Sequence, residues 1–276
     1  MKKKLAERAS FNHPENTYLS ILNQQYMWSK KQLFAVVCTL SILGFSCSTS
    51  YRANKLAFND YRITNQRPQD SAMKSFLKPY GDSVNKSMND VLAITTVVLE
   101  KKQPEGGLGN LLADAMRSMA AEKFGMQVDA AFINNGGVRL PALAVGNITR
   151  GKVFEVAPFD NLIILQKLTG VQVQAFLDYV AGRGGWPSSG LRFQIKEKKA
   201  INIEIGGKPL DLSAEYTIAN NDYVINGGDD CVVLKAIPQI NKGYVFRDAV
   251  IDYLQQLTLS GKKISNTIEN RTSYAQ

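Results

Sequence analysis

The chain has 276 residues, of which 45% are apolar and 21% are charged, a balance typical of a globular protein with one large or two small domains. Its formal charge of +9 is uneven, because residues 1–60 carry eight Lys or Arg against three Asp or Glu. No later stretch combines clustered Lys and Arg with interleaved aromatic residues. The sequence therefore does not indicate a basic groove for nucleic acid, and no nucleic-acid partner is expected.

A secretory signal pattern begins at Met27. Two lysines precede the apolar segment Leu33–Phe45, which has thirteen residues and is followed by Cys47. A membrane-spanning helix needs about 20 residues, so this segment is too short for a permanent anchor. We predict a signal peptide over 27–47 with a lipoprotein-like cleavage box, lipidation of Cys47, and an upstream extension over 1–26; ordinary signal cleavage is the alternative. The protein is then expected to be exported and lipid-anchored in the cell envelope, at the periplasmic or outer surface.

Residues 48–68 lack sustained periodicity and are predicted to form a tether. The chain beyond them mixes helices and strands without regular alternation. This order predicts a single α+β domain over 69–265, with a mixed sheet and packed helices, and a tail over 266–276. In chain order the patterns predict a helix from Asp70, a buried strand over 91–99, a helix from near Asn110 that ends at Gly125, a strand over 128–134, a helical turn capped by Thr149, a strand over 161–168, a helix opened by Thr169, antiparallel strands over 191–195 and 201–205, a strand over 216–220 and a final helix around 246–257.

Histidine is nearly absent, since His13 is the only one and lies in the predicted extension. This excludes Ser-His-Asp and Cys-His nucleophilic sites and histidine-based metal sites in the folded part. Neither a GxxxxGK[ST] loop nor a GxGxxG turn after a strand is present. A hydrolase that uses only carboxylates stays open, because paired acids can be distant in sequence. Cys231 alone remains for the folded part, so no disulfide is expected within it, and we predict a small buried side chain.

Five polar or aromatic loop motifs remain. They are "GLGNLLADAMR" (107–117), "INNGGVR" (133–139), "APFDN" (157–161), "SSGLRF" (188–193) and "NNDYVINGGDD" (220–230). In this order and spacing they resemble the C-terminal, substrate-binding domain of the secreted 5'-nucleotidases, a group that includes the periplasmic UDP-sugar hydrolases. The resemblance covers roughly residues 89–234 and implies the α+β fold of that domain.

The resemblance implies a clamp for a nucleotide base. In that family two aromatic residues sandwich the base, and the matching positions are Phe159 and Tyr223. Stacking on an aromatic ring tolerates any base, so broad base specificity is expected. Asn161 would hydrogen-bond the base edge, and Asp229 would accept hydrogen bonds from ribose hydroxyls. Arg139 would bind the phosphate through its planar guanidinium group.

Two further positions follow from the same resemblance. Asn110 would line the site at the start of a helix, where free N–H groups favour an anion, and Gly190 would lie beside the base. Without the resemblance, Phe159 is as readily an ordinary core residue. Arg139 is then most simply a solvated turn residue, and Asn110 is no more than a helix cap. The chain also departs from the family at Asp160, where glycine is frequent, and in "GGDDC", which replaces Gly-Gly-Asp-Gly-aromatic.

Full-length members of that family place a metallophosphoesterase domain before this one, with two metals held by Asp, His and Asn. Here the predicted signal peptide and tether occupy the corresponding space. We therefore expect the nucleotide-binding half of a split 5'-nucleotidase, inactive alone and without a cofactor of its own, with divalent metals in a separately encoded partner chain. The alternatives are a stand-alone nucleoside- or nucleotide-binding surface lipoprotein and a fold reused for surface interactions.

Overall fold

The computed structural model describes residues 30, 32–38, 57, 62, 64, 68–264 and 266–276. Two compact units are present, Met1–Pro68 and Gln69–Gln276, and the second begins where the domain is predicted to begin. In the first unit residues 32–38 are helical, and Cys38 is exposed. No helix among the described residues is both long and apolar enough to cross a lipid bilayer. The predicted lipidation site Cys47 lies outside the described residues.

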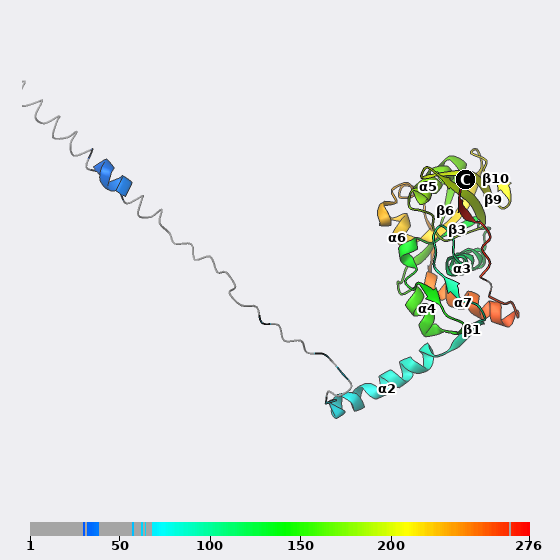
Figure 1. The fold of residues 1–276 in the computed structure, drawn as a ribbon, viewed down its shortest axis with the longest axis horizontal. Helices are drawn as coiled ribbons and strands as arrows, with labels where there is room; N and C mark the ends of the chain where they lie inside the picture. The colour runs from blue at the N-terminus through cyan, green and yellow to red at the C-terminus, as the bar shows by residue number, and fades with distance from the viewer. Residues whose placement is uncertain are drawn as a thin grey trace, which may run out of the picture. The chain divides into compact units, whose positions relative to one another are not determined.

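The second unit contains helices and strands in mixed order (Figure 1). The helices are α2 (Ser71–Met88), α3 (Gly107–Phe124), α4 (Arg150–Val156), α5 (Gly170–Gly182), α6 (Asp222–Ile225) and α7 (Phe246–Leu259), with short 3-10 turns at Asn135–Gly137 and Gly228–Asp230. The strands are β1 (Val91–Thr95), β2 (Leu99–Glu100), β3 (Ala130–Phe132), β4 (Ala142–Leu143), β5 (Gly146–Thr149), β6 (Leu162–Thr169), β7 (Ser188–Ser189), β8 (Leu191–Lys196), β9 (Lys199–Ile205), β10 (Lys208–Pro209), β11 (Glu215–Asn221), β12 (Ile240–Val245) and β13 (Thr272–Tyr274).

A five-stranded sheet in the order β12-β6-β11-β3-β7 forms the centre of the domain. Strands β11 and β3 run parallel, whereas the other neighbouring pairs are antiparallel. The expected mixed sheet and the α+β fold are therefore confirmed. A smaller sheet in the order β10-β9-β8-β13 contains the predicted antiparallel pair β8 and β9.

The central sheet is buried on both faces. Side chains alternate between the two faces of a strand, so Ile163 and Leu165 of β6 join one apolar core while Ile164 joins the other. The first core also contains buried residues of α3 and α7, and the second contains those of α5, β8 and β9. Burial on both faces explains the continuous apolar run over residues 162–165 of β6.

Several helix ends follow directly from the sequence. The side chain of Asp70 accepts hydrogen bonds from Ala72 N and Met73 N at the start of α2, and Thr169 begins α5 with a capping box. Gly125 ends α3 in the left-handed conformation, with φ of 63°. Helix α3 nevertheless begins at Gly107 rather than near Asn110, because extended Gly106 is its N-cap and Asn110 N already donates to Gly106 O.

Two expectations about strands and termini were wrong. The apolar run over 91–99 is not one buried strand: it forms β1 and β2, and Val91 and Ile94 of β1 are exposed. Residues 266–276 do not form a free tail, since β13 pairs in parallel with β8. Arg271 also anchors this segment to α3 through a bidentate ion pair with Asp114, at 2.7 and 2.9 Å.

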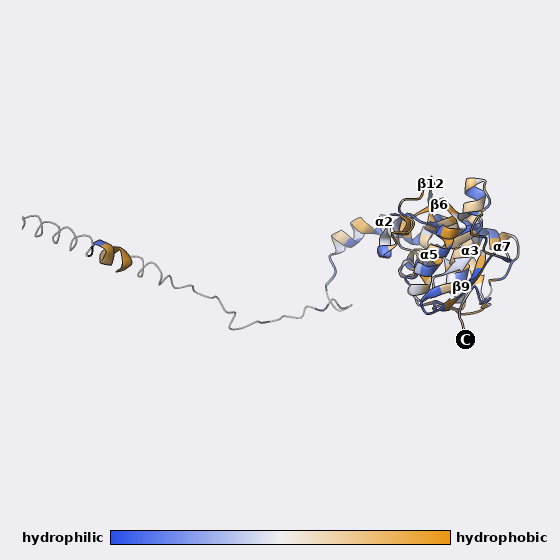
Figure 2. Cartoon of the chain, turned by 90° about the horizontal axis from the view of Figure 1, so that it is seen from above, coloured by the Kyte–Doolittle hydropathy of each residue, from blue (hydrophilic) through white to orange (hydrophobic). Residues whose placement is uncertain are grey.

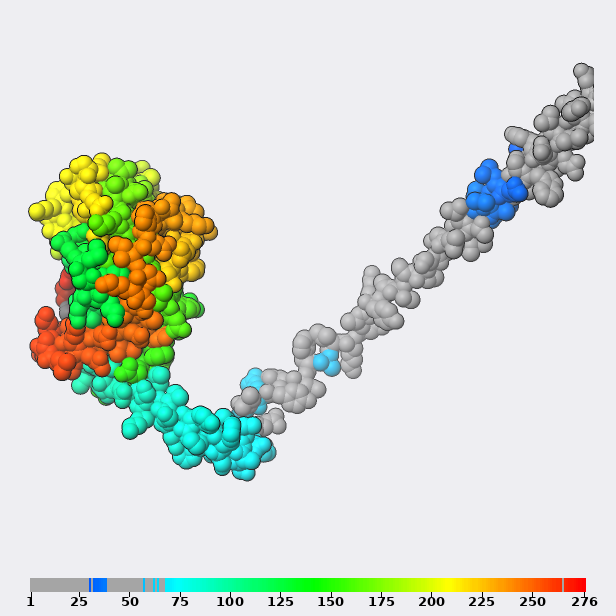
Figure 3. Space-filling model, turned by 180° about the vertical axis from the view of Figure 1, so that it is seen from behind, coloured from blue at the N-terminus to red at the C-terminus, as the bar shows by residue number. Residues whose placement is uncertain are grey.

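Helix α2 has no buried residue. It extends away from the rest of the second unit (Figure 3) and carries apolar and polar residues together (Figure 2). The helix has an apolar face, and this face is exposed to solvent. More than half of the surface of each of its members is accessible: Met73, Phe76, Leu77, Tyr80 and Val84.

Candidate functional site

Three loops from distant parts of the sequence meet around one cavity. They follow β3, α4 and β11, and they bring together a basic, an aromatic and an acidic segment. The cavity has a volume of about 410 Å³. It is lined by Asn134, Gly136, Gly137, Arg139, Phe159, Asp160, Asn161, Tyr223 and Asp229. Five of the seven predicted site residues therefore lie at one place.

Tyr223 lies on the short helix α6, which the sequence analysis did not predict. The helix begins after β11 because the side chain of Asn221 accepts a hydrogen bond from Val224 N. The Tyr223 ring is packed against Gly228, where an added Cβ would lie 2.5 Å from ring carbons Cδ1 and Cε1. Gly228 is thus required by the close approach of the ring.

Asp229 is held in place by a chain of polar side chains. Its Oδ1 accepts from Tyr223 Oη at 3.1 Å, and its Oδ2 accepts from Asn134 Nδ2 at 2.7 Å. Asn134 in turn accepts from Asn221 Nδ2 at 2.9 Å. Asp229 itself has a φ of 54°, which Asp tolerates better than most residues. Asn134 was missed at the sequence level, although its position at the end of a buried strand and before Gly-Gly was a usable signal.

Phe159 forms another wall of the cavity and is 47% exposed, close to the 49% of Tyr223. The guanidinium carbon of Arg139 lies 5.6 Å from the centre of the Phe159 ring. This distance allows a cation–π interaction. The cavity therefore offers flat aromatic surface and a fixed positive charge side by side.

Lys101 adds a second positive charge beside Arg139. Its Nζ donates to Val138 O at 2.8 Å. Burial lowers the pKa of Lys101 below its ordinary value, and the neighbouring charge of Arg139 lowers it further. An anion bound near this pair would relieve their repulsion. No sequence motif pointed to Lys101, because β2 brings it to Arg139 only in the folded domain.

Asn161 ties the aromatic segment to α6. Its Nδ2 donates to Asp222 Oδ1 at 2.9 Å, and the same oxygen accepts from Leu162 N at 3.1 Å and Tyr223 N at 2.9 Å. One of the two N–H groups of the Asn161 amide is engaged in this way, and the amide oxygen can accept a hydrogen bond from a ligand. The loops that carry Phe159 and Tyr223 are thus fixed relative to each other by one carboxylate.

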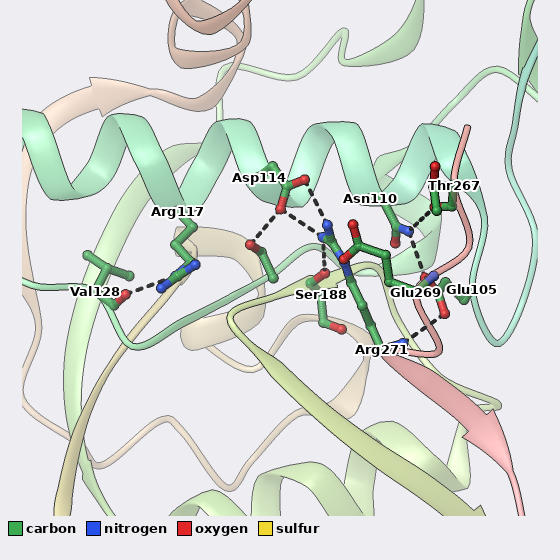
Figure 4. Close-up of polar contacts among 10 residues, drawn as sticks. Glu105, Asn110, Asp114, Arg117, Val128, Ser188, Thr267, Glu269 and Arg271 are labelled. Atoms are coloured by element: carbon green, nitrogen blue, oxygen red, sulfur yellow. Dashed lines mark hydrogen bonds and ion pairs between the residues drawn. The ribbon is translucent and has the colours of Figure 1, made fainter. Parts of the chain in front are cut away.

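Asn110 and Gly190 do not line this cavity, contrary to their predicted positions. Asn110 is buried, and its Nδ2 donates to Glu105 Oε1 at 2.7 Å and to Thr267 O at 3.4 Å (Figure 4). It therefore binds the C-terminal segment. Gly190 lines a separate polar cavity with Arg117. Its φ of 84° and the 2.1 Å that would separate a Cβ from Asp129 O explain the glycine structurally.

Comparison with known proteins identifies the family of the chain. The model of the family "5'-nucleotidase, C-terminal domain" matches residues 84–236. A 5'-nucleotidase of Vibrio parahaemolyticus is 28% identical over 204 residues, which are 70% of this chain and 35% of that protein. A 5'-nucleotidase of Vibrio cholerae is 29% identical over 203 residues, with the same coverage. The chain thus spans about 35% of the length of these relatives.

Solved structures agree with this assignment. The 5'-nucleotidase precursor of Thermus thermophilus matches with a TM-score of 0.63 and 29% identity, over 76% of this chain and 44% of that one. The NAD nucleotidase of Haemophilus influenzae matches with a TM-score of 0.58 but only 15% identity, which supports the shared fold alone. The chain belongs to the 5'-nucleotidase C-terminal domain family, and the predicted resemblance is confirmed.

Whether the domain can bind a metal depends on the side chains it brings together. Among the described residues, no group of three or more His, Cys, Asp or Glu side chains is placed to hold a metal ion. Cys231 is buried, as predicted, and burial raises the pKa of its thiol to about 11.

Proposed function

We propose that this chain is the nucleotide-binding half of a split 5'-nucleotidase. It clamps a nucleoside phosphate, and a separately encoded metallophosphoesterase chain hydrolyses it. The observation that carries the proposal is the cavity that Phe159, Tyr223 and Arg139 share. Aromatic surface suits a base and a guanidinium group suits a phosphate, and nucleotides combine both chemistries.

Each part of a nucleotide has a matching group in the cavity. The base would stack between Phe159 and Tyr223, where each stacking contact is worth about 1 to 3 kcal/mol. The carboxylate of Asp229, oriented by Asn134, would accept hydrogen bonds from the ribose hydroxyls. The phosphate would lie towards Arg139, with Lys101 adding charge. The chain itself would bind and orient the substrate, and the divalent metals of the partner would supply the hydrolytic chemistry.

The assignment of metal chemistry to a second chain rests on the side chains available here. Family members hold two metals with Asp, His and Asn, as the sequence resemblance implies, and His13 is the only histidine of this sequence.

We propose that the partner packs against α2. The exposed face formed by Met73, Phe76, Leu77, Tyr80 and Val84 has the i, i+3, i+4, i+7 spacing of helices that bind in apolar grooves. On the polar side Lys74 and Lys86 flank the ion pair of Lys78 with Asp82. Acidic residues are therefore expected around the partner's groove.

We also propose that the protein is exported and anchored at the cell envelope through a lipid on Cys47. The signal pattern over 27–47 supports this proposal. Metabolic labelling with a fatty-acid analogue tests it. Cys47→Ser should abolish the label, and Cys38→Ser should keep it. Loss of the label in Cys38→Ser with retention in Cys47→Ser would contradict the assignment of Cys47.

Calorimetric titration of the domain with AMP and adenosine tests the binding role. We expect AMP to bind more tightly than adenosine, and the absence of binding of both would remove the nucleotide functions and leave a surface-interaction domain. The chain alone with added divalent metals is expected to release no phosphate from AMP. Robust turnover by the chain alone would overturn the split enzyme.

Purification of the tagged chain from its native cells distinguishes the two nucleotide functions. A split enzyme is expected to bring a metallophosphoesterase with it, and the Phe76→Ser, Leu77→Ser variant should lose that partner while Lys78→Ser keeps it. Nucleotide binding without any partner would instead support a stand-alone binding lipoprotein.

A further inference from the structure

Asp160 is a residue that the proposed clamp does not use. It lines the cavity beside Phe159, and 81% of its side chain is exposed. A carboxylate accepts hydrogen bonds and donates none when it is ionised. We propose that Asp160, held by Arg247, selects bases that carry an exocyclic amine, such as adenine, over bases with an oxo group at the same position. The inference rests on the proposed nucleotide-binding function.

Arg247 fixes the segment in which Asp160 lies. The Arg247 side chain is only 11% exposed and forms an ion pair with Asp160 Oδ1. Its Nη1 donates to the carbonyl oxygens of three consecutive residues, Ala157 at 3.4 Å, Pro158 at 3.0 Å and Phe159 at 3.4 Å. The guanidinium carbon also lies 4.1 Å from the centre of the Phe154 ring.

These contacts give Asp160 a defined orientation. Arg247 comes from α7, nearly ninety residues away, and engages the backbone and the carboxylate of one short segment at once. The neighbouring residue is fixed as well, because Phe246 N donates to Asn161 O at 2.8 Å. The positive charge of Arg247 offsets that of the carboxylate, so an acceptor can lie in a site for an anionic ligand without strong repulsion.

Asp160 and Asn161 together present acceptors at the cavity. The amide of Asn161 gives one N–H to Asp222 and can offer its oxygen to a ligand, and Oδ2 of Asp160 is not the oxygen that pairs with Arg247. Adenine meets two acceptors with the two hydrogens of its amine. Hypoxanthine, the base of inosine, carries an oxo group in place of the amine and an N–H at N1. One of the two acceptors would then face the lone pairs of the oxo group and would lose its hydrogen bond.

Calorimetry with adenosine and inosine tests this selection, because these nucleosides differ in the six position of the base and in the protonation of N1. The wild-type chain is expected to bind adenosine about tenfold more tightly than inosine, the range of one hydrogen bond to a charged but exposed group. Asp160→Asn can donate to the oxo group and should abolish or reverse the preference. The matched control is Asp230→Asn, since the carboxylate of Asp230 is 97% exposed, pairs with Arg183 and does not line the cavity.

Arg247→Met tests the positioning role. The ratio of adenosine to inosine affinity should fall to the ratio measured for Asp160→Gly. The double variant Arg247→Met, Asp160→Gly should show the same ratio as either single variant. If Arg247 only stabilised the fold, Arg247→Met would lower the melting temperature and leave the ratio unchanged. Equal binding of adenosine and inosine by the wild-type chain would overturn the inference and leave the nucleotide clamp standing. Binding of neither nucleoside and no binding of AMP would overturn both.

Discussion

The strongest test of the proposed clamp is the substitution Gly228→Ala. An added Cβ would lie 2.5 Å from Tyr223 Cδ1 and Cε1 and 2.6 Å from Cζ. Separations below 3 Å force one of the two groups to move, and the ring of Tyr223 is the group with free space, because it is 49% exposed beside a cavity. The displaced ring would leave its place against the base. The loss of one stacking contact, about 1 to 3 kcal/mol, corresponds to roughly 5- to 150-fold weaker binding of AMP.

The assay is calorimetric titration of wild type, Gly228→Ala, Tyr223→Ala and the double variant with AMP. If Gly228→Ala acts through the ring, the double variant should bind as weakly as Tyr223→Ala alone, because the two changes remove the same contact. A matched control is Gly182→Ala, which does not line the cavity and where the added Cβ would find its nearest neighbour at an ordinary 3.9 Å. Binding of AMP by Gly228→Ala with wild-type affinity would refute the reasoning.

Three further outcomes are expected. Arg139→Met should weaken the binding of AMP at least tenfold and leave adenosine unchanged, which titration with both ligands measures. The lowered pKa of Lys101 means that it loses its proton at a lower pH than an ordinary lysine, so AMP binding should decline as the pH rises through the pKa of Lys101. Lys101→Arg stays charged and should remove this decline, and the binding of adenosine should not show it. Arg271→Met leaves Asp114 without its bidentate partner and should cost about 3 kcal/mol, seen as a thermal melting point lower by roughly 6 to 12 °C, whereas an unchanged melt would show that the C-terminal segment is not anchored there.

Local signals in the sequence predicted much of the fold. Caps at Asp70 and Thr169 and the left-handed glycine at Gly125 mark helix ends because these residues satisfy backbone groups within a few positions. The helix α6 was missed, since its four residues are too few to show a period. The C-terminal strand β13 was missed for another reason, because it depends on pairing with β8, about eighty residues earlier.

The candidate site divides in the same way. The order and spacing of five motifs predicted the family, and with it Phe159, Tyr223 and Arg139 as candidate site residues. This was possible because each of these residues lies within a short contiguous motif. Only the tertiary structure decided that Asn110 faces the C-terminal segment and that Gly190 lines another cavity. A position next to a helix start or a turn does not specify which side of the domain it faces.

The sequence by itself determined what each loop can do chemically: which segment can stack, which can bind an anion and which can accept hydrogen bonds. The tertiary structure decided which of these groups act together. Lys101 reaches Arg139, Asn134 orients Asp229, and Arg247 holds Asp160, yet each pair is separated by between about forty and one hundred residues. Such pairs form only when the sheet and α7 bring the loops together, and no local periodicity or motif records them.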